Sequence, residues 1–254
     1  MTVRIDFNCD MGESFGAYTL GLDEAIIRSI TSANIACGFH AGDPQVMRKT
    51  VRLAEAHGVG IGAHPAFPDL QGFGRRNMTV SPAEVTNDLV YQIGALTAFT
   101  TAKRLQHVKP HGALYNMAVP GGDLAKAICD AVLQVDPQLI LLVLAGSAYA
   151  RVAEETGARI ARETFADRAF NADGSLVARS KPGAVIHDVE AVVERSIRMV
   201  TEGTAVAITG EIIPMKADTI CLHGDTPGAV ALAARLKAQL EHAGVTLTRL
   251  AELV

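Results

Sequence analysis

The chain has 254 residues, of which 49% are hydrophobic and 20% are charged, and its formal net charge is −4. No basic run stands out, Trp is absent and aromatic residues are few, a composition that argues against nucleic-acid, anionic-membrane or sugar-stacking surfaces. The longest aliphatic run, residues 139–144, is far too short to span a bilayer and fits a buried strand. The N-terminal residues lead directly into a predicted strand without the apolar region of a secretory signal, so we expect a cytoplasmic protein.

Short apolar strands alternate with amphipathic helices along the chain. Strands are expected at 3–10, 32–37, 59–63, 105–109, 138–145, 159–165 and 218–222, and helices at 23–30, 43–57, 81–103, 123–135, 147–156, 185–202 and 226–242. A long loop is expected at residues 65–79, and irregular structure at 166–184 with a small hairpin around 171–174. Residues 206–208 suit a short strand, and the secondary structure of 210–216 is ambiguous. Residues 245–250 suit a strand or an arm. The alternation of strands and helices predicts a parallel sheet wrapped by helices in one domain over residues 1–254.

Two architectures fit this alternation of strands and helices, a closed or nearly closed (β/α) barrel and an open doubly wound sheet. Polar residues stand at nearly every predicted strand end, which favours a barrel, because the strand ends of a barrel converge on one face. In an open sheet, such residues gather where the strand order reverses. Neither G-x-G-x-x-G after a strand nor G-x-x-x-x-G-K-[ST] occurs, so the common phosphate-binding loops are missing.

The first strand and two histidines supply candidate site residues. Asp6, Asn8 and Asp10 alternate, so they point to the same side of the strand. His40 and His64 each follow a strand, and together with Asp10 they form an Asp/His/His set of the kind that holds a divalent metal with an open position. The spacing is non-local and H-E-x-x-H is absent, so structural histidines remain the alternative.

Further polar groups follow later strands and the long loop. Lys109 and His111 flank Pro110, and Arg75 and Arg76 are suited to clamp a carboxylate or phosphate. Two more strand-end clusters are Asp167-Arg168 and His223-Gly224-Asp225, although Asp225 is also placed to cap the last helix. The four cysteines, Cys9, Cys37, Cys129 and Cys221, lack C-x-x-C spacing and suit reduced, buried thiols.

Several co-linear motifs resemble the LamB/YcsF family from about residue 3 to the C-terminus. They are NCDMGE at 8–13, SANIACGFHAGDP at 32–44, GAHP at 62–65, GFGRR at 72–76, VKPHGALYN at 108–116, FADR at 165–168 and CLHGD at 221–225. The resemblance implies the irregular seven-stranded (β/α) barrel that is shared with polysaccharide deacetylases and some glycosidases. It also implies ATP-dependent opening of 5-oxo-L-proline to L-glutamate, by an A subunit that works with 5-oxoprolinase subunits B and C.

Within that resemblance, the residues acquire expected roles. Catalytic candidates are Asp10, His40, His64, Lys109 and His111, and substrate-binding candidates are Asp6, Asn8, Arg75, Arg76, Asp167, Arg168, His223 and Asp225. Asp10 or His64 would be the general base on water, and His111 or Lys109 would stabilise the developing charge. ATP is expected as co-substrate, with partners supplying or sharing phosphoryl transfer. Alternatives are a metal-dependent carbohydrate deacetylase with Asp10, His40 and His64 as ligands, and a non-catalytic lactam-binding subunit.

Overall fold

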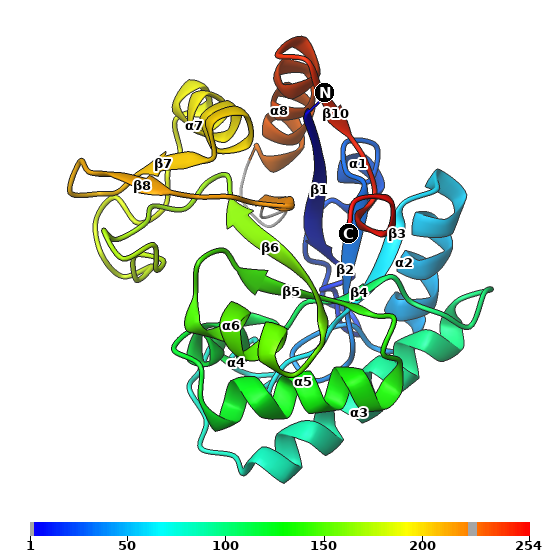
Figure 1. Ribbon diagram of the computed structural model, residues 1–254. Helices are drawn as coiled ribbons and strands as arrows, with labels where there is room; N and C mark the ends of the chain where they lie inside the picture. Colours follow the sequence, from blue (N-terminus) through cyan, green and yellow to red (C-terminus); the bar gives the residue numbers. More distant parts are fainter. Residues whose placement is uncertain (1–2, 223–227) are drawn as a thin grey trace.

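The computed structural model describes residues 3–222 and 228–254 (Figure 1), and seven parallel strands close into a barrel. They are β1 (Val3–Met11), β2 (Ser32–Ala36), β3 (Gly60–His64), β4 (His107–Val108), β5 (Ile140–Leu144), β6 (Arg159–Phe165) and β9 (Thr219–Leu222). Each strand pairs with the next in this order, and β9 pairs back with β1 through Asp6 to Cys9. The predicted seven-stranded barrel is confirmed.

Helices lie around the outside of the strands (Figure 1). They are α1 (Asp23–Ile26), α2 (Pro44–His57), α3 (Pro82–Phe99), α4 (Gly112–Ala118), α5 (Asp123–Val135), α6 (Ala148–Glu155), α7 (Val189–Glu202) and α8 (Ala229–His242). The Asp43 side chain caps α2, and Ser81 with Glu84 forms the predicted capping box of α3. None of these described helices is both long and apolar enough to cross a bilayer.

Several boundaries differ from the predictions. The first helix ends at Ile26 instead of residue 30, α3 ends at Phe99 instead of 103, and β4 contains only two residues. The ambiguous segment forms β8 (Ile212–Pro214), antiparallel to β7 (Thr204–Val206), and β10 (Val245–Leu247) pairs with the start of β1. Helix α4 was not predicted, because Gly112 opens it and no side chain caps it.

The barrel interior has an apolar floor. Ile140, Leu142 and Ala161 form a cluster of their own with Leu250, and all four are buried. Leu250 belongs to the 3-10 turn η1 (Leu250–Glu252), which is tied to the entrance of β4 because the Ala251 N–H donates to Gln106. This turn therefore closes the N-terminal end of the barrel, and polar side chains fill the interior toward the other end.

Candidate active site

A cavity of about 620 Å³ opens at the C-terminal ends of the strands. Its walls include two carboxylates, two histidines and several cations: Asp10, Glu13, His64, His111, Lys109, Arg75, Arg168 and Arg179. Apolar contacts come from side chains such as Tyr115 and Phe165. The sequence placed its candidate site at this end of the barrel, and all but two of these eight polar residues were among its predictions.

Asp6 lies deeper in the barrel and does not line the cavity. Its carboxylate accepts hydrogen bonds from Thr31 (2.7 Å), Ser32 (2.6 Å) and Thr219 (2.5 Å), and the residue is fully buried. Burial raises the pKa of Asp6 to about 6, although the three hydroxyl donors act in the opposite direction. Asp6 thus supports the floor of the site, whereas the sequence suggested direct substrate binding.

Above Asp6, an amide network joins the strands. The Asn34 amide donates to Asn8 Oδ1 (2.7 Å) and to Asp10 Oδ1 (2.8 Å), and Asn8 donates to Glu163 Oε1 at 3.2 Å. His107 Nε2 lies 2.7 Å from Asn34 Oδ1, and because an amide oxygen only accepts, this nitrogen carries a proton. Burial lowers the pKa of His107 to about 3, so the ring is neutral and the network orients Asp10.

Lys109 provides a buried positive charge. Its Nζ lies 3.0 Å from Asp10 Oδ1, from Glu163 Oε1 and from the Cys221 sulfur. Burial opposes the charged form, but Asp10, Cys221 and Glu163 outweigh it and raise the pKa of Lys109 well above its ordinary value. The sequence left Lys109 open as a base or an anion-binding group, and these contacts suit a fixed cation.

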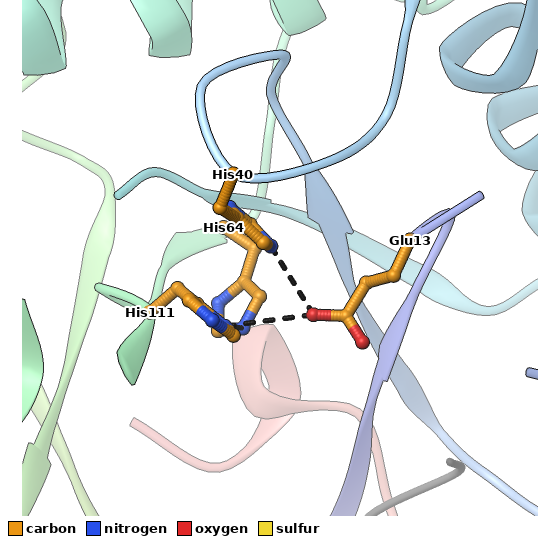
Figure 2. Close-up of side chains that lie close together, drawn as sticks. All are labelled: Glu13, His40, His64 and His111. Carbon is orange, nitrogen blue, oxygen red and sulfur yellow. Dashed lines mark hydrogen bonds and ion pairs between the residues drawn. The ribbon is translucent and has the colours of Figure 1, made fainter. Parts of the chain in front are cut away.

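Three histidines and Glu13 gather at one place, as Figure 2 shows. His40 Nε2 lies 3.1 Å from Glu13 Oε1, His111 Nδ1 lies 3.5 Å from the same oxygen, and His111 Nδ1 lies 3.0 Å from His64 Nε2. The rings of His40 and His111 stack at 3.8 Å. Burial, followed by neighbouring histidines, lowers the pKa of both His40 and His111 well below the ordinary value.

Glu13, His40, His64 and His111 offer one ligand atom each within 4.8 Å of one another, so they could hold a metal ion. The sequence predicted Asp10, His40 and His64 instead. Asp10 Oδ2 is close to this group, 3.3 Å from His64 Nε2. The structure therefore keeps the two histidines in the candidate ligand set and adds Glu13 and His111.

The predicted arginines occupy different environments. Arg75 lines the cavity, whereas Arg76 lies in the loop, where it is 65% exposed and its Nε donates to buried Asp69 at 2.9 Å. Arg168 lines the cavity while donating to the carbonyls of Val177 (2.7 Å) and Ala184 (3.3 Å), and burial lowers its pKa to about 10.

Three other predicted residues remain, Asp167, His223 and Asp225. Asp167 is buried next to Arg168 but is not among the described residues that line the cavity. His223 and Asp225 lie outside the described residues. Their expected roles in binding substrate therefore stay predictions.

Besides Arg179, which lines the cavity, sequence reasoning missed three members of the site. Glu13 follows β1 in a turn where an acidic residue is equally suited to capping, and Glu163 lies in β6 among charged residues typical of an exposed strand. Cys221 was interpreted as apolar filler, and it is buried, but its sulfur contacts Lys109. The signal that could have found Glu163 is its position on β6, because it shares a strand face with buried Ala161.

A closed parallel barrel with charged residues at the C-terminal strand ends is the arrangement in which barrel enzymes place their active sites. Residues 5–254 match the model of the LamB/YcsF family. The A subunit of 5-oxoprolinase from Thermococcus onnurineus is 54% identical over 254 residues, covering 99% of this chain and 100% of that protein. The chain therefore belongs to the LamB/YcsF family, as its motifs predicted.

Solved structures agree with this assignment. The lactam utilization protein from Thermus thermophilus shares 48% identity and has a TM-score of 0.91, with 96% of this chain and 98% of that chain covered. A deacetylase solved with substrate has a TM-score of 0.50 at 13% identity, with 99% of this chain and 90% of that chain covered. At that identity the likeness shows a shared barrel fold alone.

Proposed function

We propose that this chain binds and opens the lactam 5-oxo-L-proline as the A subunit of an ATP-dependent 5-oxoprolinase. The observation that carries the proposal is the 54% identity over the full length to the A subunit of a 5-oxoprolinase. The name of that relative supports an assembly with other subunits, which the family resemblance gives as subunits B and C. The reaction would consume ATP and yield L-glutamate, ADP and phosphate.

The cavity has the charge that such a substrate needs. The substrate 5-oxo-L-proline carries a carboxylate at neutral pH, and Arg75 and Arg168 present guanidinium groups, which suit planar carboxylates and phosphates. Lys109 adds a buried cation among the residues that line the cavity. A volume of about 620 Å³ exceeds what a five-membered ring requires, so an activated, phosphorylated ring also fits.

The lactam is a stable amide, so ring opening needs activation. Transfer of a phosphoryl group from ATP to the carbonyl oxygen releases ADP and makes the ring carbon electrophilic. Water then adds to that carbon, the C–N bond breaks as the nitrogen takes a proton, and an acyl phosphate remains. A second water releases phosphate and leaves L-glutamate. Because this chain lacks the common phosphate-binding loops, we assign phosphoryl transfer to the partners, alone or shared with this chain.

Asp10 and Lys109 are the residues best placed for the hydrolytic steps. Asn34 and Lys109 hold Asp10 Oδ1, so Oδ2 is directed toward His64 and is placed to take a proton from attacking water. Lys109 lies 3.0 Å from that carboxylate and stabilises negative charge that develops on the substrate oxygen.

The decisive assay measures ATP hydrolysis together with glutamate release from 5-oxo-L-proline. It compares this chain alone, subunits B and C alone, and all three together. We expect glutamate only from the complete mixture. If this chain leaves the turnover of its partners unchanged, the proposal fails, and a panel of acylated sugars with and without chelator would test the carbohydrate deacetylase alternative.

Substitution of Asp10 tests the assigned base. In the complete mixture, Asp10→Asn should lower turnover by about 100-fold or more, because proton transfer by a positioned side chain contributes about that much. Asp130→Asn, in an exposed i,i+4 pair with Lys126, is the matched control and should retain normal turnover. Near-normal turnover of Asp10→Asn would show that the base is another group. If the chain binds 5-oxo-L-proline tightly and no site variant changes turnover, the non-catalytic lactam-binding subunit is favoured.

A further inference from the structure

The four side chains of the histidine cluster, Glu13, His40, His64 and His111, come from different parts of the barrel rim and point at one another (Figure 2). His64 ends β3, whereas the other three lie in segments that follow β1, β2 and β4. All three histidines are at least 96% buried. A buried group of this kind must be satisfied by protons, by water or by an ion, because unpaired polar atoms are costly to bury.

The hydrogen bonds on the outer side of two rings fix where their protons are. His64 Nδ1 lies 2.6 Å from the Lys109 carbonyl, and His111 Nε2 lies 2.8 Å from the Phe73 carbonyl. A carbonyl oxygen only accepts, so each of these nitrogens carries the hydrogen. In a neutral ring the other nitrogen is then bare, and these two bare nitrogens, His64 Nε2 and His111 Nδ1, face each other at 3.0 Å.

Two facing lone pairs repel each other unless a cation lies between them. The same bare His64 nitrogen also lies 3.3 Å from the Asp10 carboxylate, and His111 Nδ1 lies 3.5 Å from Glu13. Electron-pair donors therefore converge on one point from several directions. This is the arrangement of a metal centre, and two of its histidines, His64 and His111, are held by outer hydrogen bonds to backbone carbonyls.

We propose that Glu13, His40, His64 and His111 bind one divalent first-row transition-metal ion at the wall of the cavity. Three imidazoles and one carboxylate suit Zn²⁺, Co²⁺ or Ni²⁺ better than Mg²⁺ or Ca²⁺, which prefer oxygen ligands. Ligands about 2.1 Å from a common ion lie roughly 3.0–3.4 Å apart in octahedral or tetrahedral arrangements. The separations of 3.0 and 3.1 Å fall within that range, and the separation of 3.5 Å lies just beyond it.

A proton shared between His64 and His111 is the competing explanation. One proton would satisfy the contact at 3.0 Å and would place an imidazolium beside Asp10. It would not draw His40 and Glu13 into the same group, whereas an ion engages all four ligand atoms. Glu13, His64 and His111 also line the cavity, so a five- or six-coordinate ion here would present a further coordination position to water or to a substrate oxygen.

The test uses the full chain alone and needs neither ATP, lactam nor partner subunits. Protein stripped with a chelator and dialysed is titrated with Co²⁺ and with Zn²⁺ by calorimetry, and the visible absorption of bound Co²⁺ is recorded. We expect one ion per chain. His40→Gln and Glu13→Gln should each weaken binding by more than about 10-fold, since loss of even an outer-shell partner costs 10–100-fold in metal affinity.

His57→Gln is the matched control, because His57 is exposed on α2 and should leave metal affinity unchanged. Circular dichroism and thermal unfolding of the metal-free variants show whether each is folded, and His111→Gln provides a third ligand variant if one of the others is not. Absence of stoichiometric binding in the wild-type chain, or equal weakening by His57→Gln, overturns the proposal. Either result for metal binding says nothing about the lactam reaction, which the glutamate assay tests separately. Failure of the glutamate assay would likewise not contradict the binding of an ion.

Discussion

At the scale of single residues, Asp6 makes folding stability depend on pH. Its pKa is raised from 3.8 to about 6 in the folded chain, chiefly by burial. Between these values the unfolded chain releases the Asp6 proton while the folded chain keeps it, so stability falls as pH rises through this window. The Asp6→Asn side chain cannot ionise. From pH 4 to pH 7 the wild type should therefore lose about 2–3 kcal/mol of unfolding free energy relative to Asp6→Asn.

Urea unfolding of both proteins at the two pH values measures this difference directly. Other carboxylates titrate in both proteins and cancel in the comparison. Asp43→Asn serves as a contrast, because hydrogen bonds from the Gly16, Val46 and Gln45 N–H groups lower the pKa of Asp43. Most of its titration lies below pH 3.8, so from pH 4 to pH 7 its difference from wild type should change little and with the opposite sign. A pH-independent gap between wild type and Asp6→Asn would contradict the burial argument.

The sequence could predict part of the site because strand alternation and strand ends are visible in it. Asp10, His64 and Lys109 were found in this way, and all three line the cavity. Glu13 was not found as a ligand, because nothing local distinguishes a ligand from a capping carboxylate in a turn. Glu163 was also missed, since its contact with Lys109, which directly follows β4, reaches over β5 and depends on how the sheet curves into a barrel.

At the scale of elements, β3 depends on a glycine that makes room for its neighbour. A Cβ at Gly62 would lie 2.1 Å from His107 Nε2 and within 2.4 Å of two ring carbons. The ring is buried and held by Asn34, so it cannot withdraw easily. Gly62→Ala should lower the unfolding free energy by about 3 kcal/mol, the upper end of the usual cost of overpacking.

Gly94 on α3 offers the matched substitution. A Cβ there meets nothing within 4 Å, and the position is exposed in the middle of a helix. Gly94→Ala should therefore stabilise the protein by about 0.5–1 kcal/mol, since Gly carries an entropic cost in helices. Chemical unfolding of both variants measures the contrast, and similar values for the two would show that the space around Gly62 is not limiting.

The elements that the sequence predicted well share strong local signals. Asp43-Pro44 and the capping box at Ser81 fixed the starts of α2 and α3, and Gly58 ends α2 in a left-handed conformation (φ 66°). Helix α4 lacks such signals and begins at Gly112. A Cβ added at this position would lie 2.5 Å from the Gly74 carbonyl oxygen. Its start is set by the close approach of the 65–79 loop, a tertiary contact that local propensity does not encode.

At the scale of the whole molecule, the candidate active site and an apolar cluster that supports the fold lie at opposite ends of the barrel. The polar cavity occupies the C-terminal ends of the strands, and the apolar cluster of Ile140, Leu142, Ala161 and Leu250 closes the other end. Leu250 is the one member of this cluster that does not belong to a barrel strand. Its side chain therefore covers the N-terminal end of the barrel and packs against the three strand residues of the cluster.

Leu250→Ala tests this closure. Removing a fully buried leucine loses transfer free energy and leaves a cavity, so we expect a loss of about 2–5 kcal/mol in unfolding free energy. Val254→Ala truncates a side chain that is 37% exposed in the same segment and should change stability by less than about 0.5 kcal/mol. Because the cluster lies at the opposite end from the ligand atoms of the histidine cluster, folded Leu250→Ala should bind Co²⁺ with wild-type affinity. Weaker binding with an unchanged unfolding free energy would show that the floor positions the site and is not merely a support for the fold.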